Sequence, residues 1–63
     1  MNYSIIVSVK LEKKSGEYFV KRRSAKTGKT IITSCNRLKE DEKEFANNCK
    51  HYYEDSTCVW WVN

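Results

Sequence analysis

The sequence has few of the residues from which catalytic sites are usually built. Its 63 residues include one histidine and two glycines, and no pair of Asp or Glu residues falls on a predicted apolar face. A cysteine nucleophile needs a neighbouring base, and only His51 is available for that role. Because catalysis requires a positioned acid, base and nucleophile, we expect a binding protein that is not an enzyme.

Long hydrophobic runs are also absent. No apolar stretch approaches the roughly 20 residues that span a bilayer, and the run at residues 5–7 is too short for a signal peptide. With 40% hydrophobic and 32% charged residues, the composition is too apolar for a disordered tail. We therefore expect a single small domain, residues 1–63, that is soluble and cytoplasmic and has no membrane partner.

Cysteine occurs in an odd number, so the thiols of Cys35, Cys49 and Cys58 cannot all pair within the chain. Reduced thiols are the simpler interpretation, with Cys49 and Cys58 as small buried hydrophobes. A zinc site would need His51 as its fourth ligand, but Cys49 and His51 lie two positions apart, about 200° around a helix. We expect neither a metal ion nor another cofactor.

The stretch RSAKTGKT, residues 23–30, ends like a phosphate-binding loop but lacks the glycine with which such a loop begins. Arg23 stands at that position, and the β-branched run IITS that follows predicts a strand and not a helix N-terminus. For AKTGKT, residues 25–30, a hairpin turn is the better interpretation, with Gly28 at positive φ. Lys26 and Lys29 then project from its tip.

Alternating apolar residues from residue 3 to residue 11 predict a half-buried first strand. The face predicted to be buried carries Ile5, Val7, Val9 and Leu11. A turn at residues 12–17 then leads to a second strand, so two adjacent antiparallel strands are expected.

The second strand must choose which face it buries. Tyr18 and Val20 point one way, and Phe19, Lys21 and Arg23 point the other. Burying Lys21 and Arg23 would cost several kcal/mol for each unpaired charge. We therefore expect Tyr18 and Val20 inside, with the basic residues and Phe19 exposed together.

A third strand is predicted over residues 30–35, followed by Asn36, a good helix N-cap. The residues that then recur at helical spacing are Leu38, Phe45, Cys49 and Tyr52, with Ala46 and Tyr53 beside them. The acidic residues 40–42 lie near the positive end of the helix dipole, which favours this helix. The run CVWWV, residues 58–62, predicts a last strand in which Trp60 and Trp61 point to opposite faces.

The predicted order of elements is β-β-β-α-β, an α+β fold. A three-stranded antiparallel sheet with one helix packed across a face is a compact solution for this order. The C-terminal strand either extends that sheet at an edge or pairs with a second copy to form a homodimer.

The charge of the chain is divided between its two parts. Residues 1–39 hold ten Lys or Arg against two acids, and residues 40–63 hold two against six. Basic side chains neutralise phosphates, an aromatic among them can stack on a base, and Arg22 and Arg23 are suited to base edges. The alternative is an ordinary solvated charged face. The candidate nucleic-acid-binding residues are Lys13, Lys14, Phe19, Lys21, Arg22, Arg23, Lys26 and Lys29.

The sequence YFVKRRSAKTGKTIITS, followed by a polar helix, resembles the N-terminal arm-binding domain of phage and transposon tyrosine recombinases, which is related to AP2-type DNA-binding folds. The resemblance covers about half the chain and implies a protein of a phage or mobile element. It also implies that the sheet enters the DNA major groove, with contacts from the outer face of the second and third strands. The residues that match the pattern in order are Tyr18, Val20, Lys21, Arg22, Thr27, Gly28, Lys29 and Ser34.

The last third of the chain supports a different function. Trp and Tyr dominate protein-binding hot spots, and an acidic helix can compete with nucleic acid for a basic enzyme surface. The alternative to nucleic-acid binding is therefore an inhibitor or adaptor of a host protein, such as a defence or nucleic-acid-processing enzyme. Its candidate protein-binding residues are Glu40, Asp41, Tyr53, Trp60 and Trp61.

Overall fold

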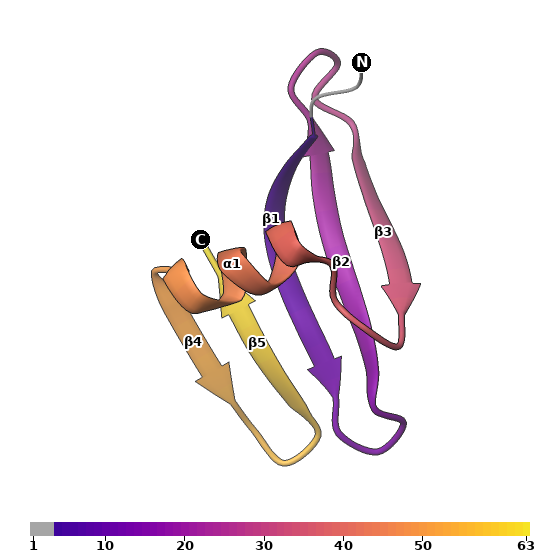
Figure 1. Ribbon diagram of the computed structural model, residues 1–63, viewed down its shortest axis with the longest axis vertical. Helices are drawn as coiled ribbons and strands as arrows, with labels where there is room; N and C mark the ends of the chain where they lie inside the picture. The colour runs from indigo at the N-terminus through magenta and orange to yellow at the C-terminus, as the bar shows by residue number, and fades with distance from the viewer. Residues whose placement is uncertain (1–3) are drawn as a thin grey trace.

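A computed structural model describes residues 4–63, which form a five-stranded antiparallel sheet and one helix (Figure 1). The sheet order is β3-β2-β1-β5-β4, and the predicted start of the first strand at residue 3 lies outside the described residues. The protein is thus the expected small α+β fold, with a larger sheet than expected. The elements are β1 Ser4–Glu12, β2 Glu17–Ser24, β3 Thr30–Cys35, α1 Glu40–Asn48, β4 His51–Glu54 and β5 Cys58–Val62.

Glycines shape the two hairpins that join β1 to β2 and β2 to β3. Gly16 has a φ of 72° and Gly28 a φ of 77°, a region that other residues rarely adopt. The Gly28 N–H donates to the Ser24 carbonyl at 2.9 Å, which closes the second turn. The predicted hairpin turn in AKTGKT, residues 25–30, is confirmed, since the turn lies between the end of β2 at Ser24 and the start of β3 at Thr30.

Burial in β2 follows the expected choice of face. Val20 is fully buried and is paired with Val9 of β1, which is also fully buried. The alternation predicted for β1 is wrong at its start, because the register shifts between Ile6 and Ser8. Ile5 is therefore paired with Arg23 and is 47% exposed, instead of sharing the buried face with Val9.

The helix is shorter than the sequence pattern predicts. It begins at Glu40 after Lys39 and not after Asn36, and it ends at Asn48. The predicted helical positions of Tyr52 and Tyr53 are wrong, because both residues belong to β4. Cross-strand pairing explains the difference, since Tyr52 lies opposite Trp61 and Tyr53 opposite Trp60.

The C-terminal strand extends the predicted three-stranded sheet at its β1 edge, and β4 then adds to the far side of β5. β5 pairs with β1 on one side and with β4 on the other, so its backbone has no free edge within the described chain. β5 therefore offers no free backbone edge for strand addition by a second copy. The sheet edges are β3 and β4.

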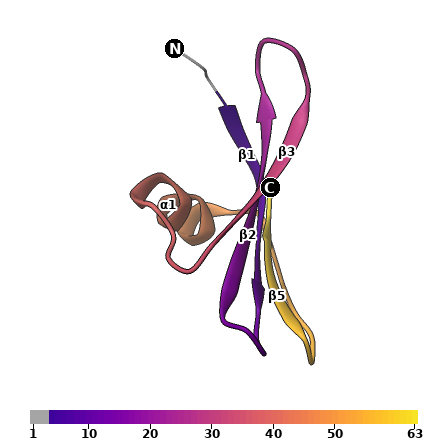
Figure 2. The ribbon, with the colours of Figure 1, turned by 90° about the vertical axis from the view of Figure 1, so that its right-hand side faces the viewer.

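The helix covers one face of the sheet only (Figure 2). It packs over β1 and β5, above a core in which Val9, Val20 and Val59 are buried. We call the opposite side of the sheet the open face. Within residues 4–63, no helix is long and apolar enough to cross a membrane. Residues whose side chains project from the open face include Ser8, Lys10, Phe19, Lys21, Arg23, Ile32, His51, Tyr53, Trp60 and Val62.

Candidate nucleic-acid interface

One row of cross-strand neighbours carries three aromatic rings across the open face. Phe19 of β2 lies opposite Lys10 of β1, and Lys10 in turn lies opposite Trp60 of β5. Trp60 lies opposite Tyr53 of β4. Because residues directly opposite one another share a face, all four side chains project from the same side of the sheet. We call these four residues the aromatic row.

Lys10 occupies the centre of the aromatic row. Its Nζ lies 4.8 Å from the ring centroid of Phe19 and 5.1 Å from that of Trp60. A cation held over a ring face is attracted by the ring quadrupole, so the two rings fix the ammonium between them. At the end of the row, Tyr53 stacks on His51 with centroids 6.3 Å apart. The row therefore combines ordered rings with a positive charge.

A second row, next to the first, adds another lysine. Lys21 lies opposite Ser8 on one side and Ile32 on the other, and the row continues through Val62 to His51. Ile32 is 65% exposed at the sheet edge. The two rows border an open hollow of about 360 Å³, which is lined by Ser8, Lys10, Phe19, Lys21, Ile32 and Trp60.

Positive charge continues from these rows toward one end of the molecule. Arg23 follows Lys21 on the same face and is paired with Thr30. Beyond it, Lys26 and Lys29 are exposed in the β2–β3 loop, at the upper end in Figure 1. We call Lys10, Lys21, Arg23, Lys26 and Lys29 the basic track. The opposite end of the open face carries the paired acids Glu12 and Glu17.

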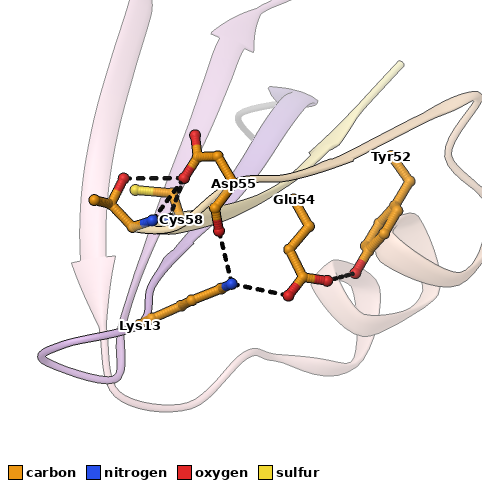
Figure 3. A network of polar contacts seen from close by, with 6 residues as sticks. Lys13, Tyr52, Glu54, Asp55 and Cys58 are labelled. Atoms are coloured by element: carbon orange, nitrogen blue, oxygen red, sulfur yellow. Dashed lines mark hydrogen bonds and ion pairs between the residues drawn. The ribbon is translucent and has the colours of Figure 1, made fainter.

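Lys13 and Lys14 lie at that opposite end, in the β1–β2 turn, away from Lys26 and Lys29 (Figure 1). The Lys13 ammonium donates to Glu54 at 2.8 Å and to the Asp55 carbonyl at 2.7 Å (Figure 3). The hydrogen bond to Glu54 raises the pKa of Lys13 and lowers that of Glu54. Lys13 therefore serves an internal contact and is not part of the basic track.

Arg22 projects from the helix side of β2. Its guanidinium donates to Asp41 and to Glu42, both at 3.0 Å. Glu42 is buried, and its second oxygen accepts the Lys39 backbone N–H at 2.7 Å. The hydrogen bond from Arg22 lowers the pKa of Asp41. Arg22, predicted from the sequence to contact base edges, instead anchors the first turn of α1.

The predicted protein-binding residues are divided between the two faces. Trp60 and Tyr53 belong to the aromatic row, whereas Trp61 lies on the helix side, with its ring centroid 6.1 Å from that of Tyr52. Glu40 and Asp41 belong to α1, and so lie across the sheet from the open face. Phe19 was predicted to bind nucleic acid, and Trp60 and Tyr53 were predicted to bind a protein. The fold places all three in the aromatic row.

The cysteines of the described chain are free, with Cys35 in β3, Cys49 directly after α1 and Cys58 in β5. The helix ends just before Cys49, whose thiol donates to the carbonyls of Ala46 and His51. Residues 4–63 contain no group of three or more His, Cys, Asp or Glu side chains arranged to hold a metal ion.

Lys10 is the main residue of the interface that sequence reasoning missed. Lys10 alternates with Val9 and Leu11, which places it on the face away from the core. This alternation is visible in the sequence and could have identified Lys10. The pairing of β1 with β5, which brings Trp60 beside it, joins residues about 50 positions apart and has no local signal.

No protein-family model, no curated protein and no solved structure matches the chain. The interface is therefore interpreted from its own residues.

Proposed function

We propose that the protein binds nucleic acid through the open face of its sheet and does not catalyse a reaction. The observation that carries the proposal is the aromatic row lying beside the basic track on the face of the sheet opposite α1. Stacking rings and phosphate-neutralising cations are the two features that nucleic-acid surfaces combine.

The distribution of acids supports the same surface. Asp41 and Glu42 pair with Arg22 on the helix side, and Glu54 pairs with Lys13. These carboxylates do not face a polyanion bound at the open face. The resemblance to recombinase arm-binding domains points to this face too, because in that family the sheet contacts DNA.

A charge-reversal experiment tests the proposal. Fluorescence anisotropy with labelled single-stranded and duplex DNA, at about 50 and about 200 mM salt, measures affinity and its salt dependence. We expect micromolar binding at the lower salt that weakens at least about ten-fold at the higher. Lys21→Glu should weaken binding on the order of ten-fold, because it replaces a cation of the basic track by an acid.

Lys43→Glu is the matched control, because it makes the same change at an exposed helix residue across the sheet. It should alter the affinity by less than about three-fold, as expected for a charge about a Debye length or more from the ligand. Equal losses in both variants would refute the assignment to the open face. Absence of binding to either DNA at about 50 mM salt would refute the proposed function.

The alternative, a protein-binding inhibitor or adaptor, has less support. Its acidic helix is partly neutralised, because Arg22 pairs with two of the first three helix residues. Glu40 remains as an exposed acid of that turn. If the helix is the binding surface, Glu40→Lys should abolish capture of a partner while Lys21→Glu should not.

A further inference from the structure

We infer that the open face binds single-stranded nucleic acid by stacking unpaired bases, in preference to a duplex. This inference rests on the proposed function and specifies its ligand. It follows from three properties of the open face: its width, the lack of Arg, Asn and Gln side chains in its two central rows, and the arrangement of its rings.

The width of the sheet argues against entry into a DNA groove. Neighbouring strands lie about 4.8 Å apart, so the outer strands of a five-stranded sheet are separated by roughly 19 Å. The major groove is about 12 Å wide and admits a helix or a two-stranded ribbon. The pairing of β5 and β4 beside β1 therefore makes the open face too broad to lie within the groove of a duplex.

The chemistry at the centre of the open face also disfavours a duplex. Base edges are recognised in a groove chiefly by Arg or Lys on guanine and by Asn or Gln on adenine, and Lys10 at the centre of this face is held over two rings instead. In the described strands, the only guanidinium on this face belongs to Arg23, beyond the two central rows. Arg22, the other Arg of β2, donates to Asp41 and Glu42 on the helix side.

The aromatic row suits bases whose faces are accessible. In a duplex each base is stacked between its neighbours, so an aromatic side chain can stack only on an unpaired or terminal base. Phe19 and Trp60 flank the β1 strand, which sets them about 10 Å apart, and Tyr53 follows about 5 Å further along. Three rings in one line provide stacking positions for successive bases.

Lys10 supplies a positive charge for the phosphates that link the bases of a nucleic-acid strand. Its ammonium lies within 4.8 and 5.1 Å of two ring centroids, so a phosphate linking two stacked bases would meet it. Lys21 lies across the adjoining hollow of about 360 Å³. The strand would leave the hollow toward Arg23, Lys26 and Lys29, because the other end of the face carries Glu12 and Glu17.

A comparison of two ligands of equal length tests the inference. Fluorescence anisotropy at about 50 mM salt measures the affinity for a labelled 12-nucleotide oligothymidylate and for a labelled 12-base-pair duplex. We expect the single strand to bind at least about ten-fold more tightly. Phe19→Leu and Trp60→Leu should each weaken single-strand binding by at least roughly five-fold, the loss expected when one stacked base loses its ring.

β4 offers a matched pair of controls. Tyr53 is 56% exposed on the open face, and its neighbour Tyr52 is 57% exposed on the helix side. Tyr53→Leu should weaken single-strand binding, and Tyr52→Leu should change it by less than about two-fold. Equal effects of the two substitutions would overturn the role of the aromatic row.

A spectroscopic measurement separates stacking from charge attraction and does not depend on altering the rings of the row. Trp60 and Trp61 are the two tryptophans, so Trp61→Phe leaves Trp60 as the single reporter. Its fluorescence should be quenched by oligothymidylate and not by the duplex. Far-UV circular dichroism melting verifies that each variant is folded.

The outcomes distinguish this inference from the proposed function. Preferential binding of the single strand with quenching of Trp60 supports the inference. Equal or tighter duplex binding without quenching overturns the inference while the proposed function stands. Failure of both ligands to bind at about 50 mM salt overturns both.

Discussion

Three cations of the basic half differ in whether they have a carboxylate partner within the chain, and this difference separates a structural role from a binding role. Arg22 donates to Asp41 and Glu42, and Lys13 donates to Glu54. Lys10, by contrast, lies between two rings, with no carboxylate partner among its described contacts. A cation that already has a carboxylate partner within the chain gains less from a phosphate, so we expect Lys10 to contribute more to the proposed binding than Arg22 or Lys13.

Replacement of Arg22 tests its structural assignment. Its side chain is 17% exposed, and that of its partner Glu42 is 5% exposed. Arg22→Ala leaves the Glu42 carboxylate buried without its cation, which should lower the free energy of unfolding by about 3 kcal/mol. Urea denaturation followed by circular dichroism measures this change.

Arg23→Ala is the matched control, because Arg23 follows Arg22 in the chain but is exposed and projects from the open face. It should change the free energy of unfolding by less than about 0.5 kcal/mol and weaken nucleic-acid binding. A stability loss from Arg23→Ala as large as that from Arg22→Ala would contradict the assignment.

At the scale of the elements, the strands with local alternation were predictable, and the boundary between α1 and β4 was not. Tyr52 continues a helical spacing that begins at Leu38, so the local pattern favours a longer helix. Tyr52 belongs to a strand and not to the helix because it pairs with Trp61, which lies opposite it and is nine residues later in the chain. The same holds for Tyr53 and Trp60, so a contact outside the local window overrides the pattern.

The candidate site was predictable to a similar degree. Phe19, Lys21 and Arg23 share a face because β2 alternates, and the alternation is visible in the sequence. Trp60 and Tyr53 were identified as exposed aromatic candidates, but for a protein partner. Their position beside Phe19 depends on the placement of β5 next to β1, which the sequence pattern alone does not specify.

The β4–β5 hairpin carries two rings of the aromatic row, and a polar network holds its turn (Figure 3). The Asp55 carboxylate accepts the backbone N–H groups of Cys58 and Thr57 at 2.7 and 2.8 Å. Lys13 joins this turn to the β1–β2 turn through Glu54 and the Asp55 carbonyl. The Glu54 carboxylate therefore connects the two hairpins, and the Asp55 carboxylate holds the β4–β5 turn.

Acid should destabilise this network. Backbone hydrogen bonds from Cys58 and Thr57 lower the pKa of Asp55 from its ordinary 3.8, and the hydrogen bond from Lys13 lowers that of Glu54 from 4.5. Because the unfolded chain takes up these protons first, the stabilisation is complete above about pH 5. It is then lost as the pH falls below about 4.5 and through the lowered pKa values.

Thermal melting between pH 7 and pH 2 measures this loss, with Asp55→Asn as the comparison. The variant should melt at a lower temperature than the parent at pH 7. The difference should shrink as the pH falls below 3.8, since Asp55 of the parent is then protonated in the unfolded chain and, at its lowered pKa, in the folded chain as well. A melting temperature of the parent that stays constant down to pH 2 would contradict the network's role.

At the scale of the whole molecule, charge separates by face as well as by position along the chain. The sequence divides into a basic and an acidic part, and folding directs Asp41 and Glu42 of the acidic part toward Arg22 on the helix side. The open face then carries the aromatic row and the lysines of the basic track. This arrangement turns Asp41 and Glu42 away from the open face, whose own acids, Glu12 and Glu17, lie at the end opposite Lys26 and Lys29.

The central claim is that nucleic acid binds on the open face, and the two tryptophans report on it directly. Trp60 lies on the open face and Trp61 on the helix side, so their two indole N–H signals distinguish the faces of the sheet. In a ¹⁵N-labelled protein titrated with a 12-nucleotide oligothymidylate, the account predicts that the Trp60 signal shifts and the Trp61 signal stays in place. A larger shift of Trp61, or no shift of either signal at saturating oligonucleotide, would contradict it.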